Sequence, residues 1–405
     1  MRRRLPIEIL PGRLTLLELP MLTRLLARKK RTFPSQPPKP GMYHYQAPPD
    51  DPRNYRLHLR VEEDGRGVLI VNAATVLHLN ETATEYAYYF IHNLSAEQVA
   101  REMARRYRVE QARAAQDYRD FTERVLTMIE MPDLDPVTFL DIERHPPLSG
   151  KLSAPYRLDL ALTYRLPETA DATAAPLARA ARELTTEEWK FILDQAWQAG
   201  IPHVVFTGGE PTLRDDLPEL ISHAEANGQV TGLLTGGIRL ADADYLQTLL
   251  ATGLDHLMIV LQPEAQTVWK GLENALAADI FVAVHLTITP ENSASAEALI
   301  RQCASRGVKA ISLSASDPSL ADRLTELRNL AAALELSLVW DLPAPYSELN
   351  PVALETQTVT AASSIRSSLY VEPDGDVLPA QGDTRRLGNM LTDSWDSIWN
   401  ALSKT

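Results

Sequence analysis

The chain has 405 residues, of which 45% are apolar, so it can form two or three domains with sizeable cores. No stretch approaches 18 uninterrupted apolar residues, and the net charge is −13, which argue against a transmembrane helix and against general binding of nucleic acid. The single cysteine, Cys303, excludes an intramolecular disulfide and predicts no cysteine-ligated cluster. No cleavable signal pattern is present, and we expect a cytoplasmic protein.

Residues 1–54 are predicted to be a basic N-terminal segment followed by a proline-rich linker. Residues 1–32 carry nine Lys and Arg against the two acidic residues Glu8 and Glu18, which gives a local charge of +7. Leucines are interspersed among these charged residues. The pattern fits three interpretations: contact with an anionic membrane surface, docking on the acidic remainder of the chain, or no fixed contact. We do not favour membrane contact.

Residues 55–130 are predicted to be a small separate domain. Residues 55–61 and 68–71 alternate as two strands around an Asp-Gly turn, and residues 76–79 predict a third strand. Three helical patterns follow, up to about residue 130. Strands followed by three helices predict an α+β, winged-helix-like module.

This segment resembles the peptide-binding domain of pyrroloquinoline-quinone and other ribosomal-peptide maturation systems, the RiPP recognition element. The matching residues are Leu79, Asn80, Glu81, Thr82, Ala83, Ala100, Tyr107, Val109, Asp117 and Phe121. The resemblance implies that a leader peptide adds to the sheet edge as an extra strand. The candidate peptide-binding residues are Leu77, Leu79, Tyr118, Phe121 and Val125. The alternative is a folded module that has lost its ligand.

Residues 131–155 contain five prolines and are predicted to be a linker. From residue 156 to 340 the chain alternates apolar strands with amphipathic helices, and glycines follow several of the helices. Repeated right-handed crossovers give an all-parallel sheet. About six units predict an α/β fold, an open partial (β/α)6 TIM-like barrel, whose site lies at the carboxyl ends of the strands.

A short motif, Gly208-Gly209-Glu210-Pro211, follows the second of these strands. Two glycines at a strand end let the backbone approach a ligand closely, and a carboxylate beside them can hold an ammonium group. The motif resembles the Gly-Gly-Glu-Pro motif of radical S-adenosylmethionine (SAM) enzymes, which contacts the amino group of SAM. The resemblance implies a radical SAM-type barrel and a SAM site at these four residues and Thr235. We expect this site to be vestigial.

The resemblance is incomplete where that family holds its [4Fe–4S] cluster. The three positions of the family's Cys-x3-Cys-x2-Cys loop fall on Leu166, Ala170 and Thr173. Iron–sulfur clusters need thiolates, with His as an occasional substitute. We therefore expect no [4Fe–4S] cluster, no other metal, no catalytic residue, and SAM binding that is weak or absent.

Residues 341–405 contain a hairpin pattern at 369–379 with an Asp-Gly turn. This tail resembles the SPASM or twitch extension of peptide-modifying radical SAM enzymes. Ala380 stands where that family has a cysteine after the hairpin. We predict a small SPASM/twitch-like C-terminal extension without its cluster ligand.

Together these features predict a radical SAM-like pseudoenzyme without iron–sulfur ligands. Its expected role is to bind a precursor or leader peptide, or a partner maturation enzyme, in a ribosomal-peptide modification pathway. Whether it is an enzyme stays open at this stage, with the balance against catalysis. Two alternatives remain: a SAM-dependent enzyme that acts without the usual cluster, and a scaffold for a cluster-bearing paralogue.

Overall fold

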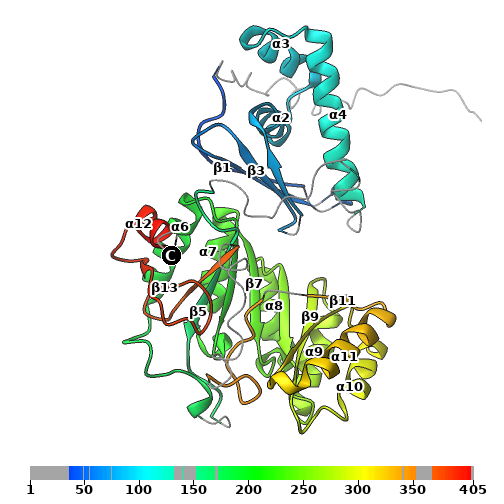
Figure 1. Ribbon diagram of the computed structural model, residues 1–405, viewed down its shortest axis with the longest axis vertical. Helices are drawn as coiled ribbons and strands as arrows, with labels where there is room; N and C mark the ends of the chain where they lie inside the picture. Colours follow the sequence, from blue (N-terminus) through cyan, green and yellow to red (C-terminus); the bar gives the residue numbers. More distant parts are fainter. Residues whose placement is uncertain are drawn as a thin grey trace, which may run out of the picture.

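The computed structural model describes residues 36–402, except 49, 54, 74, 132–138, 140–151, 169–171, 340–341 and 353–366 (Figure 1). The basic segment predicted for residues 1–32 lies outside the described residues, as does Ala170. Among the described helices, none is long and apolar enough to cross a membrane.

The N-terminal part is a four-stranded antiparallel sheet followed by three helices, which we call the module. Its sheet order is β1-β2-β3-β4, formed by β1 (Gly41–Gln46), β2 (Arg56–Val61), β3 (Gly67–Val71) and β4 (Thr75–Leu79). The helices are α2 (Glu81–Ile91), α3 (Ala96–Arg106) and α4 (Gln111–Glu130). Strand β4 pairs only with β3, so its other edge has no strand partner among the described residues.

Strand β1 is a correction to the sequence prediction, which placed residues 41–46 in the proline-rich linker. It pairs with β2 over its whole length, from Gly41 opposite Val61 to Gln46 opposite Arg56. No proline interrupts residues 41–46, so every backbone N–H needed for the ladder is available. The prolines on both sides of this stretch favoured a linker assignment. The strand was not recognised because its partner lies ten or more residues further along the chain.

The second part is built on a ten-stranded sheet of order β11-β10-β9-β8-β7-β6-β5-β12-β13-β14. Its parallel strands are β5 (Arg157–Thr163), β6 (His203–Gly208), β7 (Val230–Thr235), β8 (His256–Val260), β9 (Phe281–Ile288), β10 (Ala310–Ala315) and β11 (Ser337–Leu338). The crossover helices are α6 (Thr186–Gln198), α7 (Leu217–Asn227), α8 (Ala243–Ala251), α9 (Gln266–Leu276), α10 (Ala296–Ser305) and α11 (Ala321–Ala333). This parallel α/β arrangement fits the predicted open partial barrel.

The strands are apolar on both faces because each face is covered. One face packs against the helices, with Phe206, Leu233 and Leu257 in the same cluster as residues of α6 to α9. The other face presents a row that runs from Val205 to Ala310, and Val339 and Leu342 pack against that row. The chain that follows β11 therefore covers the inner face of the barrel.

The C-terminal part extends the same sheet. Strand β12 (Ser368–Val371) pairs parallel to β5, and β13 (Asp376–Leu378) and β14 (Gly388–Asn389) follow as antiparallel strands. The β12–β13 pair is the hairpin predicted around the Asp-Gly turn. Helix α12 (Trp395–Leu402) then packs Ile398 and Leu402 into the barrel core.

The module packs on the amino ends of the barrel strands (Figure 1). Arg56 on β2 bonds Glu225 and Asp255 with N···O distances of 2.7 and 3.2 Å, and the Nε2 of His58 lies 2.7 Å from the carbonyl of Gly228. Arg60, next on the same face of β2, donates to the carbonyls of Pro155 and Gly200. The sheet face of the module is thus covered by the barrel, which leaves the two sheet edges, β1 and β4.

Three buried histidines at this end of the barrel predict an acid-sensitive fold. Burial lowers the pKa of His58 and of His256 to about 4, and it lowers that of His203 well below 6.5. An unfolded histidine titrates near 6.5, so each takes up a proton on unfolding between pH 6.5 and 4. The free energy of unfolding should fall as the pH falls through this window, by up to about 1.4 kcal/mol per pH unit for each histidine.

Asp255 works in the opposite direction, because burial raises its pKa to about 6 and its folded state binds a proton more readily. His285, whose pKa burial lowers to about 4, adds to the effect of the three histidines, and Asp159 and Glu372, whose pKa values burial raises, act in the same direction as Asp255. Urea unfolding should still give a lower stability at pH 5 than at pH 7.5. His58→Gln should reduce the dependence of the unfolding free energy on pH by about the contribution of one histidine. An unchanged slope in that variant would contradict the assignment.

Candidate functional site

The five residues predicted for SAM lie together at the carboxyl ends of two neighbouring strands. Gly208 ends β6, and Gly209, Glu210 and Pro211 lead into the 3-10 turn Pro211–Leu213. Thr235 ends β7, the next strand of the sheet. The parallel arrangement therefore brings these residues into one place, as the alternation of strands and helices predicted.

Both glycines are required by the chain that follows β5. A Cβ on Gly208, whose φ is +122°, would lie 2.2 Å from the carbonyl oxygen of Thr163, and one on Gly209 would lie 2.4 Å from that of Arg165. The amides of Gly209 and Glu210 donate to these same carbonyls at 2.8 and 2.9 Å. The motif thus holds the loop after β5 against the end of β6.

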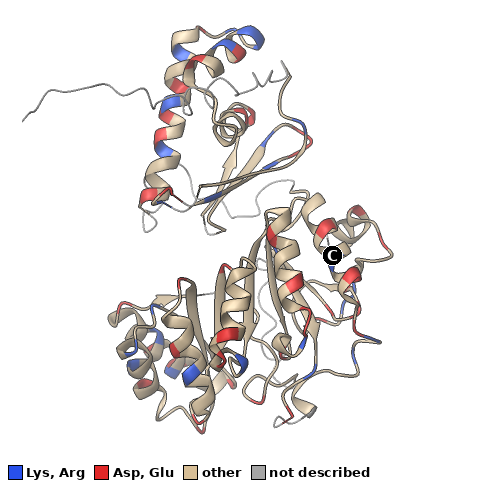
Figure 2. Cartoon of the chain, turned by 180° about the vertical axis from the view of Figure 1, so that it is seen from behind, with Lys and Arg blue, Asp and Glu red and all other residues tan. Residues whose placement is uncertain are grey.

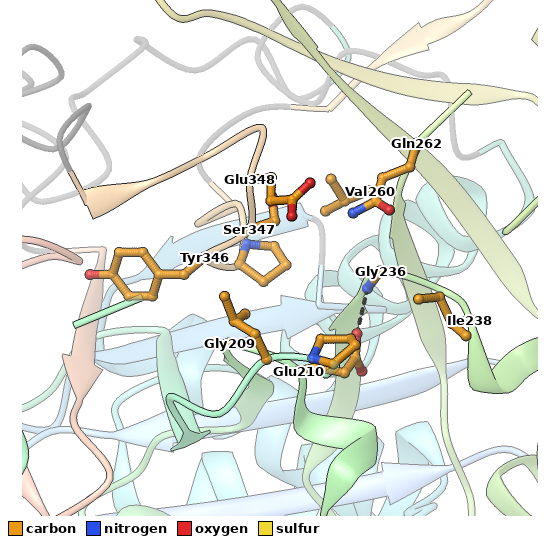
Figure 3. Close-up of a pocket in the computed structure, with 12 residues that line it drawn as sticks. Gly209, Glu210, Gly236, Ile238, Val260, Gln262, Tyr346, Ser347 and Glu348 are labelled. Atoms are coloured by element: carbon orange, nitrogen blue, oxygen red, sulfur yellow. Dashed lines mark hydrogen bonds between the residues drawn. The ribbon is translucent and has the colours of Figure 1, made fainter. Parts of the chain in front are cut away.

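The carboxylate of Glu210 is buried and accepts four hydrogen bonds from its own chain. Its Oε1 accepts from the amide and hydroxyl of Thr212 at 3.1 and 2.5 Å and from the hydroxyl of Thr235 at 2.7 Å. Its Oε2 accepts from the amide of Gly236 at 2.8 Å (Figure 3). Since a carboxylate oxygen accepts about two bonds, the capacity left for a ligand is on Oε2.

A cavity of about 60 Å³ lies beside this carboxylate. Gln262 follows β8, and Glu348 comes from the chain that crosses the barrel; both lie across the cavity from Glu210 (Figure 3). The lining residues are Leu166, Pro167, Gly209, Glu210, Gly236, Ile238, Val260, Gln262, Pro345, Tyr346, Ser347 and Glu348. The sequence did not predict residues 345–348 as part of this site, because they lie far along the chain from the glycine motif. The prolines around them were their only distinguishing pattern.

The described side chains at the predicted cluster positions are not sulfur ligands. Leu166 packs on an apolar group that contains Tyr164, Tyr346 and Tyr370, and Thr173 is exposed in the 3-10 turn Ala172–Ala174. Ala380 is exposed after β13. Cys303 is buried in α10, where burial raises the pKa of its thiol to about 11.

The five residues predicted for peptide binding differ in their exposure. Tyr118 and Val125 are buried in the module core, and the hydroxyl of Tyr118 donates to the carbonyl of Leu94 at 3.0 Å. Leu77 on β4 is also buried. Leu79 and Phe121 are only partly buried, so a ligand on this side of the module would reach those two.

The arginines of α3 and α4 do not form a uniform basic surface. Figure 2 shows acidic and basic residues alternating along α4. Arg105, Arg113 and Arg119 are paired with Glu102, Asp117 and Glu97. Backbone pairing at the β4 edge is therefore a better source of affinity for a peptide than charge on these helices.

Comparison with known proteins locates this site within a family. Residues 168–262, which include the glycine motif and the ends of β7 and β8, match the family model of the radical SAM superfamily. This stretch, which is less than half of the chain, is therefore similar to the radical SAM superfamily. The glycine motif, Thr235 and Gln262 all lie within the matched residues.

Two groups of relatives extend this result. PqqA peptide cyclases of Xanthomonas campestris and Granulibacter bethesdensis are 39% identical over 119 residues and 38% identical over 113 residues. These matches cover 29% and 27% of this chain, and 29% and 30% of those proteins, so the chain matches less than a third of their length. The fold resembles that of Streptococcus suis SuiB bound to precursor peptide SuiA, with TM-score 0.55, 16% identity and 88% of each chain covered.

The expectation of no cofactor and no [4Fe–4S] cluster is contradicted by these comparisons. Residues 168–262 match the radical SAM superfamily, and a second similar structure is SuiB bound to S-adenosylmethionine, with TM-score 0.53, 14% identity and 88% of each chain covered. Glu210 and the glycines fit the ammonium end of such a ligand. Leu166 and Thr173 do not fit an iron–sulfur cluster as ligands, and the chemistry proposed below uses none.

Proposed function

We propose that this protein binds a precursor peptide of a ribosomal-peptide modification pathway at the edge of β4, and SAM at the carboxyl ends of β6 and β7. The observation that carries the proposal is the edge of β4, which has no strand partner among the described residues, on a module that packs against the barrel. The relatives named PqqA peptide cyclase and the similarity to SuiB bound to precursor peptide SuiA favour a peptide as the partner.

The residues of this chain would bind SAM by its amino-acid end. The ammonium group donates hydrogen bonds, and the carbonyl of Gly208 and the Oε2 of Glu210 are acceptors at this point of the site. The hydroxyls of Thr212 and Thr235 hold the carboxylate of Glu210 in place. When bound, SAM supplies a sulfonium whose cleavage begins the chemistry of the radical SAM superfamily.

The peptide and SAM would bind at opposite ends of the barrel strands. The module packs at the amino ends, near Gly200 and Gly228, whereas Gly208 lies at a carboxyl end. Strand β6 has six residues, so the two ends are about 20 Å apart at 3.3 Å per residue. A peptide anchored on β4 therefore needs at least about six extended residues between its anchor and the part that reaches the site.

Hydrogen exchange of the full chain tests the proposed peptide site. The probe is the synthetic peptide encoded by any short open reading frame that neighbours the gene of this protein. The amides of Thr75–Leu79 that point away from β3 should exchange more slowly with the peptide present, because a new strand adds hydrogen-bond acceptors at that edge. Protection confined to the carboxyl ends of the barrel strands, with β4 unchanged, would contradict this location.

A second candidate function is SAM-dependent modification of the bound peptide, which the match of residues 168–262 to the radical SAM superfamily favours. Mass spectrometry of the peptide after incubation with the protein, SAM and a reductant tests it. A mass change that requires all components would establish catalysis. Binding without any mass change would favour a peptide carrier or a scaffold for a partner enzyme.

A further inference from the structure

We propose that residues Pro343–Asn350, which we call the strap, hold the SAM site closed, and that the strap must move before SAM binds. This inference rests on the proposed function, because it describes how access to the same site is controlled. The strap follows the segment that packs Leu342 on the inner face of the barrel. It then contributes one wall of the cavity beside Glu210, from Pro345 to Glu348 (Figure 3).

The strap already uses a carbonyl that the ligand needs. The amide of Tyr346 donates to the carbonyl of Gly208 with an N···O distance of 2.8 Å. An ammonium group at the glycine motif would donate to the same oxygen. Since a carbonyl oxygen can accept two hydrogen bonds, the N–H of the strap occupies one of the two positions at this oxygen, and an ammonium group would have to share it.

The side chain of Tyr346 fixes this contact. It is 1% exposed and packs edge-on against Tyr164, with the ring centroids 5.4 Å apart. The hydroxyl of Tyr164 in turn donates to Glu372 at 2.9 Å, which ties this ring to the C-terminal part of the sheet. Tyr346 is the anchor of the strap, because moving it away from Gly208 requires removing a buried ring.

Two amide side chains fasten the strap on the other side of this anchor. The Nδ2 of Asn350 donates to the carbonyl of Ala344 at 2.7 Å, and the Nε2 of Gln381 donates to the same carbonyl at 3.0 Å. Gln381 lies outside both the strap and the cavity lining. These bonds hold the strap in a bent form without contacting the glycine motif.

The remaining space is too small for the whole ligand. The cavity volume is about 60 Å³, and on this measure a cavity needs about 10–15 Å³ to hold one water, so there is room for only a few waters. A molecule with an adenosine and an amino-acid end needs several times that volume. Displacing residues 345–348 removes one wall of the cavity and frees the carbonyl of Gly208 in a single movement.

Calorimetric titration of the full chain with SAM tests the strap through three variants. Tyr346→Pro removes both the N–H and the ring, and it should bind SAM at least about tenfold more tightly than the wild type. Gln381→Ala loosens the fastening without altering the site, and a gain of about threefold or more is expected. Tyr346→Phe keeps the ring and the N–H and serves as the matched control, with an affinity close to that of the wild type.

Hydrogen exchange in the fragment that contains Tyr346 supplies a readout that does not depend on affinity. Saturating SAM should speed the exchange of this fragment in the wild type about tenfold or more, because the N–H leaves Gly208. If SAM binds while this fragment remains protected, the strap proposal fails and SAM binding stands. If neither the wild type nor folded Tyr346→Pro and Gln381→Ala binds SAM, the SAM part of the proposed function fails as well.

Discussion

The Glu210→Ala variant is expected to lose about 3–5 kcal/mol of unfolding free energy. The carboxylate accepts from two amides and two hydroxyls at the junction of β6 and β7, and it is 5% exposed. Alanine would leave these donors without an acceptor in a place that water reaches poorly. Each buried donor left unpaired costs about 1–3 kcal/mol, and relaxation of the site recovers part of the sum.

Urea unfolding of the purified full chain measures this loss. Glu348→Ala is the matched control, because Glu348 lines the same cavity but is exposed. Its stability should stay within about 0.5 kcal/mol of the wild type. A loss below about 1 kcal/mol in Glu210→Ala would show that Glu210 is not the centre of a structural network, and its carboxylate would then be available to a ligand as a whole.

The Arg60→Met variant is expected to lose a similar amount of unfolding free energy, about 3–5 kcal/mol, because it breaks a buried ion pair. Arg60 is 3% exposed, its Nε donates to Glu62 at 2.9 Å, and its Nη1 donates at 3.1 Å to the carbonyls of Pro155 and Gly200. Methionine fills a similar volume but leaves the Glu62 carboxylate buried without its cation. It also removes two bonds between the module and the barrel.

Arg66→Met is the control for this change. Arg66 lies on the same hairpin, and its pair with Asp64 is exposed, with 52% and 47% of the two side chains accessible. Exposed pairs contribute little, so a change below about 1 kcal/mol is expected. In Arg60→Met, hydrogen exchange should also become faster in β2 than in the barrel strands. Equal stability of the two variants would mean that Arg60 does not hold the module in place.

The sequence predicted the barrel well because its signals are local. Apolar runs such as Val204–Phe206, helical periodicity and the glycines after helices are all local signals, and the strands β5 to β10 fall within residues 156–340, as predicted. The glycine motif was placed correctly at the end of β6 for the same reason. Strand β1 and the strap were missed because each is defined by a partner far along the chain, β2 for one and Gly208 for the other.

The site was predicted less completely than the fold. Sequence reasoning assigned Glu210 to a ligand, whereas its environment shows a carboxylate that mainly joins two strand ends. It also assigned Tyr118 and Val125 to a peptide, although their apolar spacing on a helix equally suits the buried face on which they lie. The expectation of no cofactor treated the residues at 166, 170 and 173 as decisive, and the comparisons with radical SAM proteins contradict it.

Calorimetric titration of the full chain tests peptide binding at the edge of β4 most directly. The ligand is the peptide encoded by any short open reading frame that neighbours the gene. We expect micromolar or tighter affinity, about −8 kcal/mol, for the unmodified peptide. A peptide of the same sequence with N-methyl groups on alternate backbone nitrogens should not bind, because it cannot donate the hydrogen bonds of an added strand. Equal binding of the two peptides, or no binding of either by the folded chain, would contradict recognition at the edge of β4.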